Sequence, residues 1–314
     1  MGREKFKTKS SFSEAQVEAD VAMYLGWCTA LNTQPFRLLD VNEQKTGADK
    51  KFDAIVPIYI QFKKSDALAE WHRPKKLPEM SPLQSIRKFR SEKELADSPT
   101  LYFKLRDKAE KAIDLQHNVL YYNNKPPISY SIYVAPLTLN RDEYYNDLCC
   151  GPRFLSDPWV WRRQNIHDGR HPSGWTSRFD IQPFLRKHIS IIPHETVRDS
   201  NHFYAFSEMG DDVSWHSPGI INGGPFRLSD FMSRRIHEIF SEEQPLTTVD
   251  EALSVATSVL NELNIDSANI LNGENSFDRL RNYGRWLHKN FSIRQMILCL
   301  DKEEIQKIRF NLRR

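Results

Sequence analysis

The first 25 residues carry a hydrophobic pattern with the period of a helix. Apolar side chains recur every fourth position and form one stripe, which consists of Val17, Val21 and Leu25. Either Ser11 or Ser13 can cap this helix, and Ser11 followed by Glu14 matches a capping box. We therefore expect a helix over about residues 11–25.

Short runs of β-branched and aromatic residues follow this helix. Residues 36–39 predict one strand. Residues 52–56 and 58–62 predict two more strands, which we expect to form a hairpin joined at Pro57. Residues 67–100 contain four prolines and many charges, so we expect an irregular excursion with one short helix.

Strand and helix patterns then alternate up to residue 148. Residues 101–105 predict a strand, residues 106–122 a helix, and residues 129–134 another strand. A leading helix, several strands, a second helix and a final strand predict an α/β fold, in which helices pack on a sheet. We expect residues 1–148 to form this unit.

The second half of the chain differs from the first in composition and in predicted secondary structure. Residues 149–245 are rich in aromatic side chains and predict a β extension, with strands at 188–192 and 202–206. Residues 246–314 predict a helical C-terminal segment. The helices expected in this half are residues 226–240, 248–263, 276–289 and 293–310.

The composition describes an ordinary globular protein. Of the 314 residues, 39% are hydrophobic and 27% are charged, and the net charge is +3. No apolar run approaches the roughly 20 residues that cross a bilayer, so we expect neither a membrane protein nor a secreted one. None of the four cysteines forms a Cys-x-x-Cys pair, which favours a reducing cytoplasm over a disulfide or zinc scaffold.

Basic side chains gather on and just after the predicted hairpin. They can follow the phosphates of a nucleic acid, or they can form a solvated basic face. Besides Lys63, the residues of this basic set are Lys64, Arg73, Lys75, Lys76, Arg87, Lys88 and Arg90.

The candidate chemistry lies at the end of the predicted hairpin. Gln61 and Lys63 are two positions apart in a strand, so we expect both side chains on one face. With an Asp from the neighbouring strand, an amide oxygen suits a hard cation such as Mg²⁺, and an amine can orient a water or neutralise a phosphate. Glu14 or Glu18 of the leading helix can complete the metal ligands.

This order of elements and residues resembles the PD-(D/E)xK superfamily of restriction-endonuclease-like phosphodiesterases. The nearest version is the Mrr-type variant, in which Gln replaces the acid of the E-x-K motif, and here the motif is Gln61-Phe62-Lys63. The resemblance covers residues 11–136. It implies a restriction-endonuclease-like mixed sheet flanked by helices, one or two Mg²⁺ or Mn²⁺ ions, and a water that attacks phosphorus in line with the leaving 3′ oxygen.

The resemblance leaves two candidates for the acid. Asp49, in Gly47-Ala48-Asp49, looks like the Gly-x-Asp of Mrr-like sequences, whereas Asp53 would face Ile60 or Gln61 if the chain turned at Pro57. Four strand residues span about 13 Å, so one small metal site does not readily use both. The resemblance favours Asp49.

A second resemblance concerns the predicted helix 106–122. Residues 114–121 resemble a Gln-x-x-x-Tyr motif that some members carry behind the active-site sheet, which makes Gln116 a candidate for contact with the scissile strand or a metal-bound water. The alternative is a Gln-His pair on an exposed helix face.

The resemblance therefore implies a cytoplasmic, Mg²⁺-dependent endonuclease that acts on DNA in preference to RNA. It further suggests a role in restriction or antiviral defence, with protein partners in a defence complex, and a homodimer where both strands are cut. The alternative is a non-catalytic subunit that keeps the fold and binds nucleic acid or another protein. A neutral Gln holds a cation more weakly than a carboxylate, which is the physical basis of that alternative.

Overall fold

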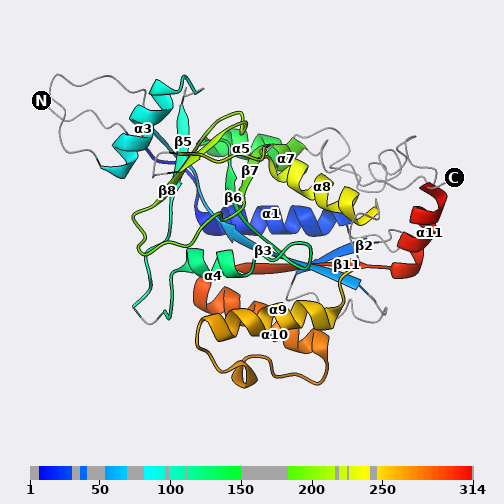
Figure 1. Cartoon of the computed structure of the whole chain (residues 1–314). Coiled ribbons are helices and arrows are strands. Elements are labelled where there is room, and N and C mark those ends of the chain that lie inside the picture. The colour runs from blue at the N-terminus through cyan, green and yellow to red at the C-terminus, as the bar shows by residue number, and fades with distance from the viewer. Residues whose placement is uncertain are drawn as a thin grey trace, which may run out of the picture.

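The computed structural model contains two β-sheets with helices packed around them (Figure 1). The expected α/β class is therefore confirmed, and the five-stranded sheet is mixed. The residues that the structure describes are 7–29, 36–40, 54–68, 81–95, 99–110, 112–149, 183–215, 219–224, 226–240 and 246–312.

The five-stranded sheet positions the candidate site. Its strands β3 and β6 are parallel, and every other neighbouring pair in it is antiparallel. In spatial order the strands are β2 (Phe36–Asp40), β11 (Arg294–Leu300), β3 (Ala54–Phe62), β6 (Tyr130–Pro136) and β7 (His188–Ile191).

The expected hairpin at Pro57 is wrong. Residues 54–62 form one continuous strand, and all nine side chains are buried. Pro57 lies inside it opposite Ile297 of β11, and the register continues on either side of the proline. Because both faces of the strand are covered by other elements, a continuous apolar run is more stable here than an exposed turn.

Strand β3 presents alternate side chains to two different cores. Its even-numbered residues pack against α1 (Glu14–Thr29) and α8 (Leu228–Phe240). Ile55 and Tyr59 instead pack against α4 (Gln116–Tyr122), α9 (Val249–Glu262) and α10 (Ser276–Phe291). In Figure 1, α1 and α8 lie above β3, and α9 and α10 lie below it.

The six-stranded sheet is antiparallel throughout and continues from the end of β3. One face packs under α3 (Pro82–Glu92), where Leu83 and Ile86 contact Tyr102 and neighbouring side chains. Its other face joins the core below β3. In spatial order the strands are β1 (Lys7–Thr8), β4 (Asp66–Leu68), β5 (Thr100–Lys104), β8 (Phe203–Ser207), β9 (Val213–Trp215) and β10 (Gly219–Ile220).

Two of the expected helices are wrong in part. Only residues 116–122 of the expected helix 106–122 are helical, as α4. The expected helix 293–310 is instead the central strand β11 followed by α11 (Lys302–Leu312). A short apolar run fits a strand and a buried helix equally well, and here pairing with β2 and β3 decides between them. The remaining short elements are α5 (Arg141–Cys149), α7 (Pro183–Arg186) and the 3₁₀ helix Ser267–Asn269.

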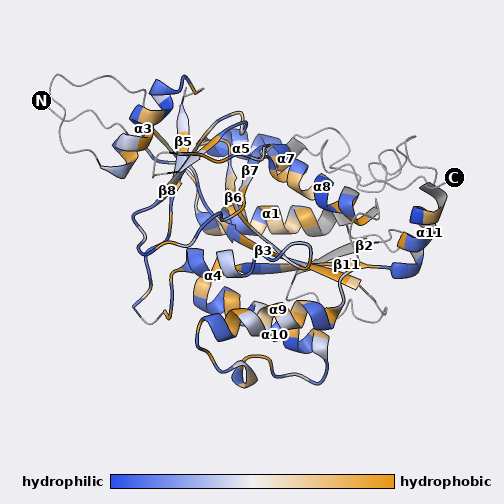
Figure 2. Cartoon of the chain, in the orientation of Figure 1, coloured by the Kyte–Doolittle hydropathy of each residue, from blue (hydrophilic) through white to orange (hydrophobic). Residues whose placement is uncertain are grey.

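The three expected segments share their sheets. Strand β11 of the segment 246–314 lies between β2 and β3 of the segment 1–148. Strands β7 and β8 of the segment 149–245 pair with β6 and β5. Helices α9 and α10 turn their apolar sides toward the sheet and their polar sides outward (Figure 2). The divisions at residues 148 and 245 therefore do not separate independent cores.

Ser13 rather than Ser11 caps the first helix. The Ser13 hydroxyl oxygen accepts a hydrogen bond from the backbone N–H of Gln16 at 3.2 Å. Ser11 instead donates its hydroxyl to the backbone oxygen of Leu139 at 3.1 Å and accepts the backbone N–H of Arg141 at 2.9 Å. The start of α1 is thereby tied to the loop that follows β6.

Candidate functional site

Lys63 lies where the chain leaves one sheet for the other. It directly follows β3, and its backbone N–H still pairs with the backbone oxygen of Val134 at 2.8 Å. Two residues later the Ser65 hydroxyl donates to the backbone oxygen of Pro136 at 2.5 Å, before β4 begins. These contacts fix the backbone on both sides of Lys63.

The Lys63 amine is buried beside one carboxylate. The side chain is only 2% exposed, and its Nζ lies 3.7 Å from Oε1 of Glu14, the first residue of α1. Burial lowers the pKa of Lys63; the negative charge of Glu14 opposes this effect, and the positive charge of Arg106 adds to it. An amine with a lowered pKa can accept a proton near neutral pH more readily than an ordinary lysine.

Gln61 supplies a buried oxygen for which the structure shows no hydrogen-bond partner. The residue is 2% exposed, its Nε2 donates to the backbone oxygen of Phe62 at 3.1 Å, and its Oε1 has no partner among the described residues. A buried acceptor without a partner costs about 1–3 kcal/mol. Such an atom fits a ligand such as a cation or a water.

Gln61 and Lys63 do not direct their functional atoms to a shared partner in the described residues. Gln61 pairs with Tyr133 of β6 and alternates with Tyr59, so it belongs to the face covered by α4, α9 and α10. The Lys63 amine instead contacts the start of α1, which packs on the other face. Lys63 can reach that helix because β3 ends at Phe62.

Glu18 lies one turn beyond Glu14 and contacts an arginine and a histidine. Its Oε1 accepts a hydrogen bond from Arg294 Nη1 at 3.1 Å and from His288 Nε2 at 2.9 Å. Burial acts to raise the pKa of Glu18, but the hydrogen bonds and charges of His288 and Arg294 outweigh it and leave the pKa lowered. Glu18 is therefore an anion, held 20% exposed beside the start of β11.

Both candidate acids of the predicted hairpin, Asp49 and Asp53, lie outside the described residues. The geometric reason for Asp53 no longer holds, because Ala54 and Gln61 lie near opposite ends of the unbroken strand β3. Among the residues that the structure describes, no group of three or more acidic, His or Cys side chains is close enough together to hold a metal ion. Among the described residues, the carboxylate that contacts the Lys63 amine is that of Glu14.

Gln116 is the first residue of α4 and ties two helices together. It is 5% exposed, and its amide donates to the backbone oxygen of Phe291, the last residue of α10. Its neighbour His117 is buried as well, between the Tyr133 hydroxyl at 2.8 Å and the backbone oxygen of Glu195 at 2.7 Å. The alternative of an exposed Gln-His face is therefore wrong.

The expected basic surface needs one correction. Arg90 is 0% exposed, and its guanidinium lies 2.5 Å from an oxygen of Asp212 and donates to Ser214 at 3.0 Å. It therefore joins α3 to the sheet and cannot contact a nucleic acid. Among the others, Lys64 lies 3.8 Å from Asp66 and Lys88 lies 3.5 Å from Glu92, while Arg87 is half-buried on α3. Outside the described residues lie Arg73, Lys75 and Lys76.

The sequence patterns missed three basic side chains near Lys63 and Glu18. They are Arg106, His288 and Arg294. Arg106 donates to the Ser292 hydroxyl at 2.7 Å, which brings the segment after β5 against the end of α10. A strand pattern over residues 294–300 could have predicted the position of Arg294, because it places this residue at the start of a buried strand, at the edge of the core.

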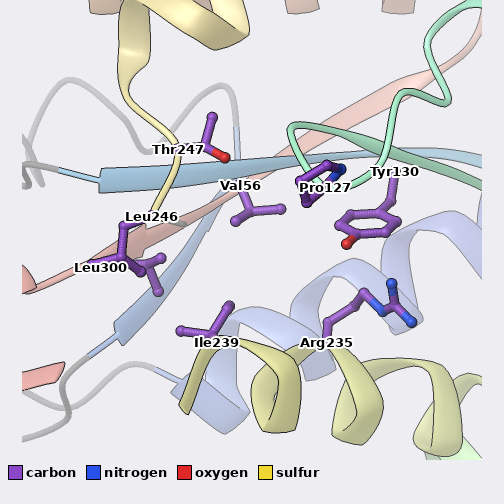
Figure 3. Close-up of a pocket in the computed structure, with 8 residues that line it drawn as sticks. All are labelled: Val56, Pro127, Tyr130, Arg235, Ile239, Leu246, Thr247 and Leu300. Atoms are coloured by element: carbon purple, nitrogen blue, oxygen red, sulfur yellow. The ribbon is translucent and has the colours of Figure 1, made fainter. Parts of the chain in front are cut away.

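A separate pocket lies near the opposite end of β3 (Figure 3). The described residues that line it are mostly apolar, and its one charged group is Arg235, whose guanidinium lies 4.4 Å from the centre of the Tyr130 ring. Arg235 also pairs with Glu238 at 2.6 Å. Because no carboxylate lines the pocket in the described part of the chain, it does not suit metal-assisted hydrolysis.

The fold and this cluster define a two-sheet α/β protein with a buried lysine at the junction of its sheets. Comparison with protein-family models, with curated proteins and with solved structures finds no match. In the described part of the chain, no helix has both the length and the apolar character needed to cross a membrane.

Proposed function

We propose that the protein is a Mg²⁺- or Mn²⁺-dependent nuclease that hydrolyses phosphodiester bonds of nucleic acid, DNA in preference to RNA. The observation that carries this proposal is the nearly inaccessible Lys63 amine, whose pKa is lowered by burial and which lies 3.7 Å from the half-exposed carboxylate of Glu14. A buried, perturbed amine next to a solvent-accessible acid is a typical arrangement of catalytic sites.

The proposed roles follow from the chemistry of each side chain. Lys63 orients a water and accepts its proton, or neutralises the charge that develops on the phosphate. The oxygen of that water forms the new bond to phosphorus, and the bond to the 3′ oxygen breaks. Glu14 is the described oxygen ligand proposed for the cation, which would polarise the phosphate when bound. Gln61 belongs to the other face of the sheet and is therefore not assigned to this ion. Asp49 and Asp53 remain sequence predictions for a further ligand.

The alternative function is a subunit that binds nucleic acid or a protein partner without cleaving it. One observation favours it: Glu18, the better metal candidate of the two helix acids by its position, is already held by Arg294 and His288. A cation would have to compete with both groups for this carboxylate. The cytoplasmic location rests on the cysteine pattern and the sequence resemblance, and the defence role and the homodimer rest on the resemblance alone.

The test compares cleavage by the wild type, Lys63→Met and Glu14→Gln, on DNA and on RNA, with Mg²⁺ and with EDTA. We expect the wild type to cleave only with the metal, and both variants to lose at least about 100-fold in rate. Lys302→Met is the matched control, since it removes an exposed lysine at the start of α11, beyond the end of β11 that lies away from Arg294.

Full activity in both variants would remove the proposed mechanism. A wild type that binds nucleic acid but releases no product under any of these conditions would favour the non-catalytic subunit. Circular dichroism of each variant checks that a loss of activity does not reflect a loss of fold.

A further inference from the structure

Two segments far apart in the sequence bring permanent positive charges to the edge of the Lys63 site. Arg106 follows β5, and Arg294 opens β11. Arg106 is joined to the end of α10 through Ser292, and Arg294 is joined to α1 through Glu18. Arg106 is also close enough for its charge to lower the pKa of Lys63, after burial as the main cause and against the opposing effect of Glu14.

The geometry of the α10–β11 corner produces this arrangement. Helix α10 ends at Phe291 and is capped by Ser292, whose backbone is left-handed with φ of 52°, and the chain then reverses into β11. This reversal places His288, of the last helical turn, and Arg294, of the strand, on the same oxygen of Glu18. The corner therefore carries basic side chains both on the helix and on the strand.

Among the described residues, the site has more basic than acidic side chains. The described acids that contact its basic groups are Glu14, which faces Lys63, and Glu18, which faces both Arg294 and His288. Arg106 lies exposed and donates to a neutral hydroxyl. The nearby acid Asp107 is paired with Lys104 at 2.8 Å and accepts the Ser200 hydroxyl at 2.5 Å. An anionic ligand is thus favoured at this corner.

We propose that Arg106 and Arg294 form a phosphate clamp, which holds the backbone of the nucleic acid on either side of the bond placed at Lys63. This inference rests on the proposed function, since it takes Lys63 as the reacting site. Arginine suits the role because its planar guanidinium presents several donors to phosphate oxygens at once. Arg294 exchanges the Glu18 carboxylate for a phosphate when the nucleic acid binds. The bound strand then runs over the α10–β11 corner rather than along α3, where Arg90 is buried.

The experiment measures binding of fluorescein-labelled DNA and RNA of about 20 nucleotides in EDTA, over a range of salt concentrations. We expect Arg106→Ala to bind about 5- to 10-fold more weakly and to reduce the slope of log K against log [salt] by about 1, as one lost phosphate contact does. Arg294→Gln is expected to show the same change.

The matched control is Arg279→Ala. Like Arg106, Arg279 is an exposed arginine that donates a hydrogen bond to an oxygen of a neighbouring segment. It lies near the start of α10, about 18 Å from Phe291 at the usual rise per residue. We expect it to leave both affinity and slope unchanged. Arg106 is the decisive variant because it is exposed, so its loss does not disturb the core.

An unchanged slope in Arg106→Ala, an equal loss in Arg279→Ala, or a wild type that binds neither DNA nor RNA would each overturn the clamp. The proposed hydrolysis fails separately. A wild type that binds through Arg106 but yields no product with Mg²⁺ keeps the clamp and loses the nuclease. A wild type that cleaves while Arg106→Ala keeps its slope retains the nuclease and loses the clamp.

Discussion

Lys63 Nζ and Glu14 Oε1 lie 3.7 Å apart, although one residue ends the buried strand β3 and the other begins α1. The pair is asymmetric: the lysine is 2% exposed and the glutamate 45% exposed. The carboxylate keeps contact with water while the amine does not. This asymmetry makes the lysine the group whose protonation depends most on the surrounding protein.

The stability of the protein should depend on pH through Lys63. Burial lowers the pKa of Lys63 in the folded state below its ordinary value of 10.5, and Glu14 only partly offsets this. Between the lowered value and 10.5 the unfolded chain binds more protons at this amine than the folded chain, so the free energy of unfolding rises with pH in that window. Lys63→Met lacks this contribution.

Urea denaturation of the wild type and Lys63→Met between pH 7 and about 10 checks this prediction. We expect the free energy of unfolding of the wild type to rise relative to that of Lys63→Met as pH rises. Lys302→Met reports what the loss of a surface lysine does by itself. A difference between wild type and Lys63→Met that is constant, or that moves the other way, would contradict a lowered pKa.

Gln61 is predicted to lower stability rather than to provide it. Gln61→Leu removes a buried oxygen that has no partner among the described residues, so without metal we expect a gain of about 1 kcal/mol in the free energy of unfolding. Added Mn²⁺ should raise the melting temperature of the wild type and of Gln61→Leu alike, and leave that of Glu14→Gln unchanged. Thermal melts with and without Mn²⁺ test both points. A Gln61→Leu variant that loses stability would show that the oxygen serves the fold, and one that loses the Mn²⁺ effect would place the oxygen at the ion.

Arg90 is predicted to be structural. Arg90→Met leaves the Asp212 carboxylate without its buried guanidinium partner, so we expect a loss of about 3–5 kcal/mol in the free energy of unfolding. Adding Asp212→Leu should recover part of this loss, because no unpaired charge then remains. Lys88→Ala on the exposed side of the same helix is the control. A loss below about 1 kcal/mol in Arg90→Met would contradict the buried pair.

Strand β11 is predicted to be essential for the first half of the chain. Ile297 is 0% exposed between β2 and β3, so Ile297→Ala should cost about 2–5 kcal/mol. Ile192→Ala is the matched control, because Ile192 is 42% exposed just after β7, and it should change stability by less than about 0.5 kcal/mol. Urea denaturation measures both. Equal, small losses would indicate that the C-terminal strand adds little to the sheet.

Local sequence patterns were sufficient to predict the elements whose buried side chains recur at a regular spacing. The stripe of Val17, Val21 and Leu25 predicted α1 because each of these side chains is buried against the same core. The strands β2, β5, β6, β7 and β8 and the helices α8, α9 and α10 were likewise predicted close to their observed positions. The α/β class followed from their order. The sequence predicted both Lys63 and Glu14 as site residues, but only the tertiary structure shows that their side chains are in contact.

Only the tertiary structure decided which distant segments meet. Periodicity within a window says nothing about a partner far along the chain, and Arg294 contacts Glu18 across 276 positions. Residues 294–300 form a strand because their backbone N–H and C=O groups pair with β2 on one side and with β3 on the other. Pro57 stays within a strand because both faces of β3 are covered. The sequence alone therefore determined the class of fold and identified Lys63 as a candidate residue. Long-range backbone pairing determined which carboxylate and which arginines lie around the Lys63 amine, because such pairing depends on the packing of the whole chain.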